Sequence, residues 1–275
     1  MDLITPVLAG AAGRLIGKLT NKSVDWLIQL VAHHSPAVQE KAEKNLQNFV
    51  NRLAKRVEQL EADLPIDQRG VFEDALNHPS SSLLMQKAMV SAATTENDDR
   101  HTILSELIAQ RLTAGADDMV ALVGGASCDV INSLSSKHIK LLGLIVRLYS
   151  IRPDQPPDIR DKDAYNKYLI SWWEVMGDLC KDIKEIHRID LDHLVGLSCI
   201  RMSIVSTNLG KLLNLPLKTE KMEVNMAEFE ALAWWQIFHK IWDSGLDHAK
   251  PTSIGALIGT LYHDSYLKSI TAIRW

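Results

Sequence analysis

Cysteine is scarce in this sequence of 275 residues, which contains only Cys128, Cys180 and Cys199. The three are far apart, odd in number and without any CxxC pairing. This pattern excludes a disulfide framework and a cysteine-based zinc site from the expected architectures. Such cysteine usage is typical of a reducing compartment, and we expect the protein to be cytoplasmic.

Glycine, proline and long apolar runs are scarce as well. Fourteen glycines and nine prolines are too few for the many tight turns of an all-β protein of this length. The longest apolar runs, such as residues 141–146, fall far short of the ~20 residues that a membrane-spanning helix requires. Near the start, Asp2, Arg14 and Lys18 interrupt the apolar residues, so we expect no secretory signal. The sequence therefore favours an all-α protein without a conventional membrane span.

Positive charge is not concentrated in the way that binding to nucleic acid requires. The net charge of the chain is −4. Residues 1–60 carry eight Lys/Arg and five Asp/Glu, a net of +3, whereas residues 61–129 carry four and twelve, a net of −8. A protein that binds a duplex needs clustered cations to replace the counterions of the phosphates. We therefore do not expect nucleic acid to be a main partner.

Apolar periodicity predicts helices from the start of the chain. Residues 1–34 contain an apolar stripe flanked by small residues, including Gly13 and Gly17, and we expect an amphipathic Gly/Ala-rich helical segment there. A second helix is predicted to begin after Ser35, with Pro36 at its first position. The apolar positions of this helix form a heptad-like seam of Leu46, Val50, Leu53, Val57 and Leu60. A seam this short is typical of a helix pair inside a bundle, and an intermolecular coiled coil is the alternative.

Three prolines within residues 150–163 predict a linker, with a domain boundary near residue 155. We therefore expect an all-α protein with a multi-helix bundle in two packed helical lobes. In this interpretation residues 35–152 form an N-terminal helical bundle, and residues 163–275 form a C-terminal lobe that is rich in tryptophan.

Helices are also predicted within the C-terminal lobe, at residues 165–176, 194–208 and 226–245. This lobe contains two tryptophan pairs, Trp172 with Trp173 and Trp234 with Trp235. Adjacent residues on a helix point about 100° apart. We therefore expect one ring of each pair in the core and the other nearer solvent. Only residues 270–275 read as a short strand.

The stretch KPTSIGALIGTLYHD, residues 250–264, contains Gly255 and Gly259, which are four positions apart. A phosphate-binding loop would need a strand before these glycines and a lysine after them, and we predict neither. Thr252 or Ser253 is instead expected to cap a helix. On that helix the two glycines would share one face, where another backbone approaches closely.

No set of residues stands out as a metal site or as a nucleophile with its base. His248, His263 and Asp264 have a spacing that matches no metal-binding motif, and we expect neither a metal nor another cofactor. Cys128 and Cys199 lie on apolar stripes, a position that favours buried neutral thiols over catalytic nucleophiles.

Residues 75–112, ALNHPSSSLLMQKAMVSAATTENDDRHTILSELIAQRL, resemble the shared segment of a family of uncharacterised bacterial proteins known by locus-derived names. In that segment an alanine-rich helix leads to a TxxxD turn and then to an LxxLIxxR helix. The matching positions here are Ala88, Ala92, Leu104, Leu107, Ile108 and Arg111. Similar stretches follow in the same order at residues 135–148, 191–199 and 251–259, the last of which contains a TSxG segment.

This resemblance covers roughly residues 50–265 and implies no particular activity. Small helical proteins with a similar architecture include abortive-infection proteins, which bacteria use against phage. We therefore expect a non-enzymatic cytoplasmic protein that acts by oligomerisation or by binding a protein partner, in bacterial anti-phage defence. Its candidate interface residues are Gly13, Gly17, Leu46, Val50, Leu53, Val57, Gly255 and Gly259.

Two alternatives stay open. Residues 3–31 could insert into a membrane or lie on it, as in a pore-forming or membrane-associated effector, with Arg14, Lys18 and Lys22 at the lipid headgroups. The other alternative is an enzyme whose site is assembled from residues distant in the sequence. The residues considered for such a site are Glu96, Asp98, His101 and Arg111.

Overall fold

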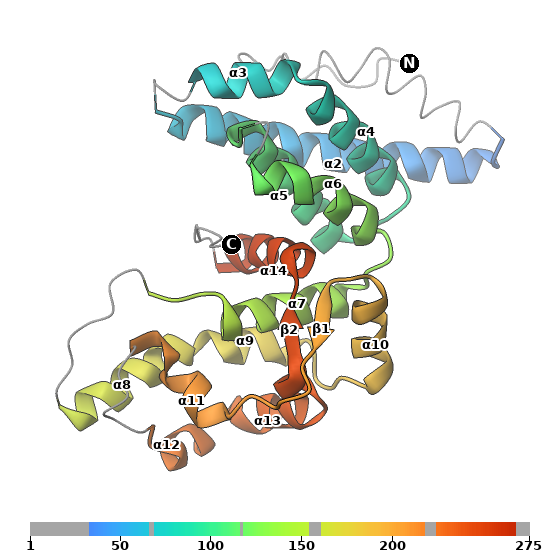
Figure 1. Cartoon of the computed structure of the whole chain (residues 1–275). Helices are drawn as coiled ribbons and strands as arrows, with labels where there is room; N and C mark the ends of the chain where they lie inside the picture. Colours follow the sequence, from blue (N-terminus) through green and yellow to red (C-terminus); the bar gives the residue numbers. More distant parts are fainter. Residues whose placement is uncertain (1–32, 66–68, 116–117, 154–160, 218–223, 268–275) are drawn as a thin grey trace. The chain divides into compact units, whose positions relative to one another are not determined.

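The structure is a computed structural model that describes residues 33–65, 69–115, 118–153, 161–217 and 224–267. Most of these residues are helical, which confirms the predicted all-α class (Figure 1). Within these ranges the only strands are β1 (Ile200–Met202) and β2 (Ala249–Pro251), which pair antiparallel in a two-stranded sheet. The chain divides into two compact units, unit 1 (residues 1–133) and unit 2 (residues 134–275).

Unit 1 is made of helices that pack on one another around α5. They are α2 (Pro36–Asp63), α3 (Arg69–Asn77), α4 (Pro79–Ala93), α5 (Asp98–Thr113) and α6 (Met119–Ile131). α2 packs against α4 and α5, and α5 also contacts α3 and α6. Local capping explains where several of them begin. Asn97 accepts a hydrogen bond from the Arg100 N–H at 3.1 Å at the start of α5, and Asp118 accepts one from the Val120 N–H at 2.8 Å at the start of α6.

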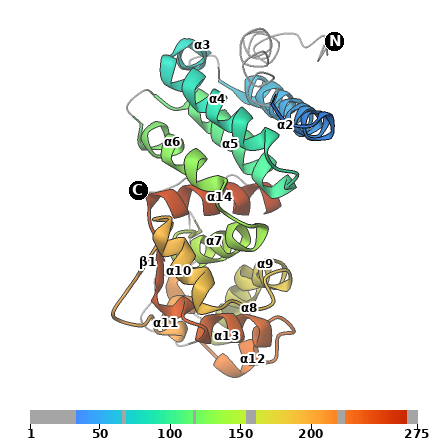
Figure 2. The same cartoon turned by 90° about the vertical axis from the view of Figure 1, so that its right-hand side faces the viewer.

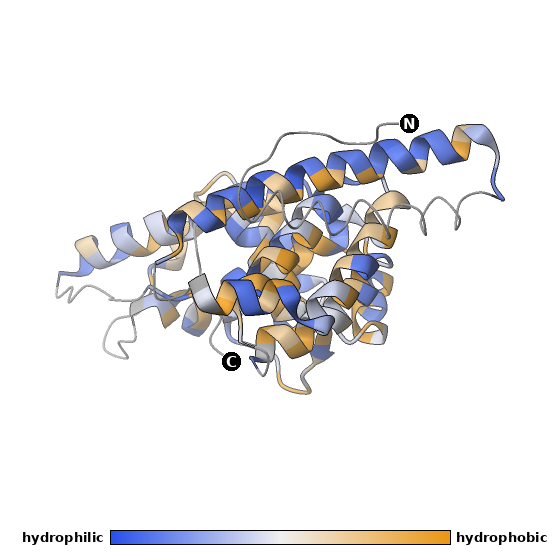
Figure 3. Ribbon diagram, turned by 90° about the horizontal axis from the view of Figure 1, so that it is seen from above, coloured by the Kyte–Doolittle hydropathy of each residue, from blue (hydrophilic) through white to orange (hydrophobic). Residues whose placement is uncertain are grey.

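The heptad-like seam of α2 packs into the core of unit 1. Leu46, Val50, Leu53 and Val57 are all buried there, while hydrophilic residues cover much of the rest of α2 (Figure 3). Arg56 on the same helix pairs with Glu106 of α5 at 2.8 Å. The seam is therefore a contact inside unit 1, and these four interface candidates are not exposed to a second chain.

Unit 2 begins with α7 (Ser136–Tyr149), although the sequence predicts that these residues belong to the N-terminal bundle. The division between the units thus lies at residues 133 and 134 and not near residue 155. The helix α7, which precedes the proline-rich stretch, makes its most extensive packing with α14 (Ser253–Leu267), which follows it, and the two helices lie side by side (Figure 2). Both sides of that stretch therefore belong to unit 2.

Short elements fill the rest of unit 2 (Figure 1). They are α8 (Lys162–Trp173), α9 (Val175–Lys181), α10 (Arg188–Gly196), α11 (Leu209–Asn214), α12 (Met226–Glu230), α13 (Trp235–Asp243) and the 3₁₀ turns Leu215–Leu217 and Leu246–His248. Aromatic rings dominate one part of the core, where Phe238 lies 5.9 Å from Trp234 and 5.9 Å from Trp242 between ring centroids.

Gly255 and Gly259 permit two close backbone contacts of α14, as predicted. A Cβ added to Gly259 would lie 2.5 Å from the Leu142 carbonyl oxygen and 2.5 Å from Val146 Cγ2, both on α7. A Cβ added to Gly255 would overlap the Cys199 carbonyl oxygen. These two interface candidates are therefore internal packing positions of unit 2.

The cap predicted for this helix is also present, since the Thr252 Oγ1 accepts a hydrogen bond from the Gly255 N–H at 3.3 Å. The expected absence of a strand before these glycines is wrong, because β2 ends at Pro251 and pairs with β1.

The helix expected at 165–176 is interrupted at Glu174, between α8 and α9. Two other predicted helices also differ from the structure. The helix expected at 194–208 ends at Gly196, because Ser198 has a φ of 56° and the chain then enters β1. The helix expected at 226–245 is divided into α12 and α13 by a turn at residues 231–234. In the first of these two cases the pairing of β1 with β2, which is distant in the sequence, overrides the helical pattern. In the second the turn is closed by local hydrogen bonds, from the Leu232 N–H to the Phe229 carbonyl and from the Trp235 N–H to the Leu232 carbonyl.

The tryptophan pairs behave differently from each other. Trp173 is fully buried and Trp172 is partly exposed, as expected of adjacent residues on a helix. Trp234 and Trp235 are both buried, so the solvent-facing ring predicted for that pair is wrong. The turn between α12 and α13 brings both rings against Phe229, at centroid distances of 6.4 and 6.0 Å. The predictions for residues 3–31, which include Gly13 and Gly17, and for residues 270–275 lie outside the described residues.

Candidate functional site

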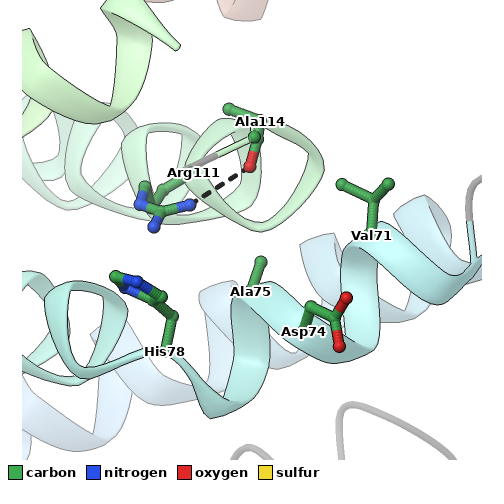
Figure 4. Close-up of a pocket in the computed structure, with 7 residues that line it drawn as sticks. Val71, Asp74, Ala75, His78, Arg111 and Ala114 are labelled. Atoms are coloured by element: carbon green, nitrogen blue, oxygen red, sulfur yellow. Dashed lines mark hydrogen bonds between the residues drawn. The ribbon is translucent and has the colours of Figure 1, made fainter. Parts of the chain in front are cut away.

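Unit 1 has a pocket of about 260 Å³ between α3 and the end of α5 (Figure 4). The residues that line it are Val71, Asp74, Ala75, His78, Arg111, Ala114 and Gly115. Figure 4 shows Arg111 and Ala114 on one side of this space and the residues of α3, followed by His78, on the other. Its walls are apolar except for one cation, one imidazole and one carboxylate.

His78 is placed by the junction of α3 and α4. Pro79 starts α4 because its missing N–H is not needed in the first turn of a helix. His78 is the N-cap, and its ring Nδ1 accepts a hydrogen bond from the Ser80 N–H at 3.3 Å. Since Nδ1 is an acceptor in this bond, the proton of the neutral ring lies on Nε2. The Ser80 hydroxyl, 2.7 Å from Nδ1, then donates its own proton to the same nitrogen.

Arg111 lies in the last turn of α5, where a cation offsets the negative end of the helix dipole. Its side chain is almost completely buried, with 2% of the residue exposed. One guanidinium nitrogen, Nη1, donates to the Ala114 carbonyl at 3.2 Å, and Nη2 donates to the Ser80 Oγ at 2.8 Å. The Nε of Arg111 is buried and donates no hydrogen bond.

The charge of Arg111 is thus met only by neutral acceptors. No carboxylate of the described residues forms an ion pair with it. Asp74 lines the same pocket but is exposed and makes no hydrogen bond to the guanidinium. A buried guanidinium keeps its charge, and burial without a counter-ion is costly. The arrangement therefore favours an anionic group that enters the pocket and meets Arg111.

The four residues considered for a distributed enzyme site do not converge. Glu96 pairs with Lys41 at 2.7 Å, and Asp98 pairs with Arg52 at 3.0 Å. His101 is buried, and its Nε2 lies 3.1 Å from the Ala92 carbonyl oxygen. These three are near the start of α5, whereas Arg111 is thirteen residues after Asp98 on that helix, about 20 Å along its axis.

Sequence reasoning singled out Arg111 but missed His78 and Ser80. The signal for them was present in the histidine–proline pair, which marks a helix start, and in the serines that follow it. What could not be read from the sequence is that the end of α5 lies beside the start of α4.

The histidines considered as metal ligands form separate pairs with their neighbours. His248 Nε2 is 3.3 Å from Asp247 Oδ2, and His263 Nδ1 is 3.1 Å from Asp264 Oδ1. In the described part of the chain no group of three His, Cys, Asp or Glu side chains could hold a metal ion.

All three thiols are buried, as predicted for Cys128 and Cys199. Burial raises the pKa of Cys128, Cys180 and Cys199 to about 12 in each case. All three are therefore protonated at neutral pH, the state that is least suited to nucleophilic attack.

Comparison with known proteins gives one match. A protein-family model matches residues 18–219, a span that includes every residue of the pocket. No curated protein and no solved structure matches the chain. Among the described residues no helix is both long and apolar enough to cross a membrane.

Proposed function

Since the chain belongs to a family of uncharacterised proteins with a locus-derived name, we propose a function from its own geometry. The protein is a non-enzymatic binding protein, and the pocket of unit 1 takes an acidic group of a protein partner. The observation that carries this proposal is Arg111, a buried cation that lines a pocket and has only neutral partners.

The donors of the pocket suit a carboxylate. Arginine presents a rigid fork of N–H groups whose geometry matches carboxylate and phosphate oxygens. The Nε–H of Arg111 has no acceptor, and the Nε2–H of His78 adds a second donor from the opposite wall. An acidic oxygen between them would pair with the Nε–H of Arg111, the donor that is buried without a partner. Its negative charge gives specificity, because an amide or a hydroxyl cannot replace that charge beside the guanidinium.

The size and the charge of the pocket favour one carboxylate over a phosphate. A volume of about 260 Å³ accommodates a single side chain or a chain end. Asp74 adds a negative charge to the wall, which repels a dianion more strongly than a monoanion. Val71 and Ala75 provide apolar surface for the methylene groups that carry the acid. A glutamate side chain of a partner combines these properties.

The test is an NMR titration of the ¹⁵N-labelled full chain with a short blocked peptide that contains one glutamate. We expect the amide signals of Ser80, Ala114 and Gly115 to shift, with a dissociation constant of about 1 mM for so small a probe. The matching peptide with glutamine in place of glutamate is expected to cause no such shifts. Arg111→Gln should abolish the response to glutamate, whereas Arg52→Gln, which removes an arginine outside the pocket, should retain it.

Val71→Trp provides a second variant that does not disturb the buried guanidinium. Val71 is 43% exposed, so a larger side chain there is expected to fold and to fill the mouth of the pocket. Loss of binding in this variant, with an unchanged melting temperature, supports the proposal. Equal binding of the glutamate and glutamine peptides, or full binding by Val71→Trp, would contradict it.

A further inference from the structure

Figure 1 shows the loop that joins β1 to α11 in unit 2. This loop holds the most exposed large apolar side chain of the described residues. Ile204 is 99% exposed and the adjacent Val205 is 74% exposed. Single apolar residues on a surface are ordinary, but two adjacent aliphatic side chains at such exposure form a projecting tip. The small polar residues Ser203, Ser206 and Thr207 surround this tip in the sequence.

Hydrogen bonds hold the loop in place on both sides of its tip. The Ser203 N–H donates to the His248 carbonyl at 2.8 Å, and the Thr207 N–H donates to the Asp247 carbonyl at 2.9 Å. Between them the Val205 N–H donates to the Ser203 Oγ at 3.2 Å. The backbone that carries the two exposed aliphatic side chains is therefore fixed by hydrogen bonds. The loop loses less conformational entropy when these side chains enter a binding partner.

Two cations lie beside this loop on the small sheet. Arg201 of β1 is directly opposite Lys250 of β2 in the antiparallel register. Like charges at directly opposite positions destabilise a sheet. In the described part of the chain neither cation forms an ion pair with a carboxylate. Lys250 instead lies over the Tyr149 ring, 3.7 Å from its centroid, and donates to the Thr207 hydroxyl at the base of the loop.

We propose that this loop is a peripheral contact site for an anionic lipid surface. Ile204 and Val205 enter the boundary between headgroups and acyl chains, and Arg201 and Lys250 bind the lipid phosphates. This inference is independent of the pocket in unit 1, since it rests on other residues and on a different ligand.

A lipid surface fits the tip better than a protein does. A stable protein interface buries about 800 Å² on each partner around an apolar core. Within this loop the exposed large apolar side chains are Ile204 and Val205, and their neighbours in the sequence are small and polar. A bilayer requires no shape complementarity from the aliphatic groups that enter it, and its anionic headgroups attract cations placed at the edge of the inserted group. Such a contact is weak and reversible, and it strengthens as the fraction of anionic lipid rises.

The experiment is flotation of the full chain with vesicles of phosphatidylcholine alone or mixed with phosphatidylglycerol. We expect the protein to float with the mixed vesicles and to be released by salt. The double substitution Ile204→Ser with Val205→Ser should lower the bound fraction by about tenfold. Arg201→Gln should weaken binding to the mixed vesicles and reduce its dependence on salt.

Ile189→Ser is the matched control, because Ile189 is also 74% exposed but lies on α10, outside the loop. It should float as the unsubstituted chain does. Circular dichroism and the melting temperature should be unchanged in all variants, since these side chains are on the surface. The proposal is overturned if the full chain does not float, if the loop variants float as well as Ile189→Ser, or if the loop binds an acidic peptide but no vesicle.

Discussion

At the scale of single residues, Arg147 shows a second way in which this chain buries a guanidinium without a carboxylate. Arg147 stacks on Trp172, 4.1 Å from the ring centroid, lies 5.7 Å from the Trp173 centroid, and donates to the Trp172 carbonyl. Burial lowers the pKa of Arg147 to about 10, so it is still charged at neutral pH. The π faces of two indoles compensate this cation, whereas Arg111 has no aromatic ring against it and lines a pocket.

Arg147→Lys tests this difference. A lysine ammonium cannot stack on an indole as a planar guanidinium does, so we expect a loss of about 1–2 kcal/mol in the free energy of unfolding. Urea denaturation followed by tryptophan fluorescence measures it. The exposed Arg188, which pairs with Asp192 at 2.9 Å, is the control, and Arg188→Lys should change stability by less than about 0.5 kcal/mol. Equal changes in the free energy of unfolding for the two substitutions would mean that stacking of Arg147 on the indole does not stabilise the fold.

The buried thiols make the free energy of unfolding fall as the pH rises, whereas a paired carboxylate makes it fall as the pH drops. In the fold the pKa of Cys128, Cys180 and Cys199 is about 12, whereas an unfolded cysteine ionises near pH 8.5, an approximate reference value. Above pH ~8.5 the unfolded chain therefore loses thiol protons that the folded chain retains. The free energy of unfolding should fall between pH 8 and about pH 10.

The same burial predicts slow labelling of the thiols. An aromatic disulfide reagent at pH 8 should react with the folded chain much more slowly than with the chain in urea. Rapid reaction of even one thiol under native conditions would contradict the burial of that cysteine.

At the scale of secondary-structure elements, the contact between α7 and α14 leaves no room for a single added carbon atom at Gly259. Gly259→Ala would place a Cβ 2.5 Å from the Leu142 carbonyl oxygen, a backbone atom that cannot rotate away. We expect a loss of about 1–3 kcal/mol in the free energy of unfolding, measured by urea denaturation. Gly125→Ala in α6 is the control, because a Cβ there meets no atom within 4 Å. Gly125→Ala should raise the free energy of unfolding by about 0.5–1 kcal/mol. The prediction fails if both substitutions change the free energy of unfolding in the same direction.

A polar cluster joins the starts of α7 and α10. Ser135 and His138 cap α7 reciprocally, and Asp190 accepts hydrogen bonds from the His187 N–H and from Lys137, each at 2.7 Å. Burial of the Asp190 carboxyl alone would raise its pKa, but these hydrogen bonds outweigh burial and lower it. The carboxylate is therefore still ionised in mildly acidic solution.

His138 makes this cluster sensitive to mild acid. Burial, and then the nearby His193 ring at a centroid distance of 4.8 Å, lower the pKa of His138 below its ordinary value, although Asp190 opposes them. Near pH ~6.5 the unfolded chain takes up a proton that the folded chain does not, so the free energy of unfolding should fall as the pH drops from 7 to 5. Urea denaturation at several pH values in this range measures the free energy of unfolding, which should change less with pH in His138→Gln than in the unsubstituted chain. His239→Gln, at an exposed histidine outside the cluster, serves as control, and an unchanged pH dependence in His138→Gln would contradict the assignment.

The helices that could be predicted are those whose signals are local. The start of α2 at Pro36 follows from residue type and spacing alone, and so does the burial of Leu46, Val50, Leu53 and Val57 in its seam, whereas Leu60 at the end of the seam is partly exposed. The strand β1 could not be predicted, because it forms by pairing with β2, far along the chain. The same holds for the pocket, since Arg111 meets Ser80 only through the packing of α4 and α5.

At the scale of the whole molecule, the proline-rich stretch predicts a domain boundary near residue 155, whereas the contacts divide the chain between residues 133 and 134. Prolines at residues 153, 156 and 157 indicate a local interruption of the helix, and α7 does end before them. They carry no information about the helix against which α7 packs. Self-association and a role in anti-phage defence depend on partners that one chain does not reveal, and both stay predictions.

The division of the chain predicts which fragment folds alone. Residues 134–275 retain α7 with α14, whereas residues 163–275 lose α7 and would expose the buried face of α14, including Leu257, Ile258 and Leu261. We expect the longer fragment to melt cooperatively by circular dichroism and the shorter one to melt without a transition or to aggregate. Gly259→Ala should lower the melting temperature of the longer fragment, because it acts within that unit. If residues 163–275 fold cooperatively without α7, the boundary expected near residue 155 is the better one, because α14 would not need α7 to complete its core.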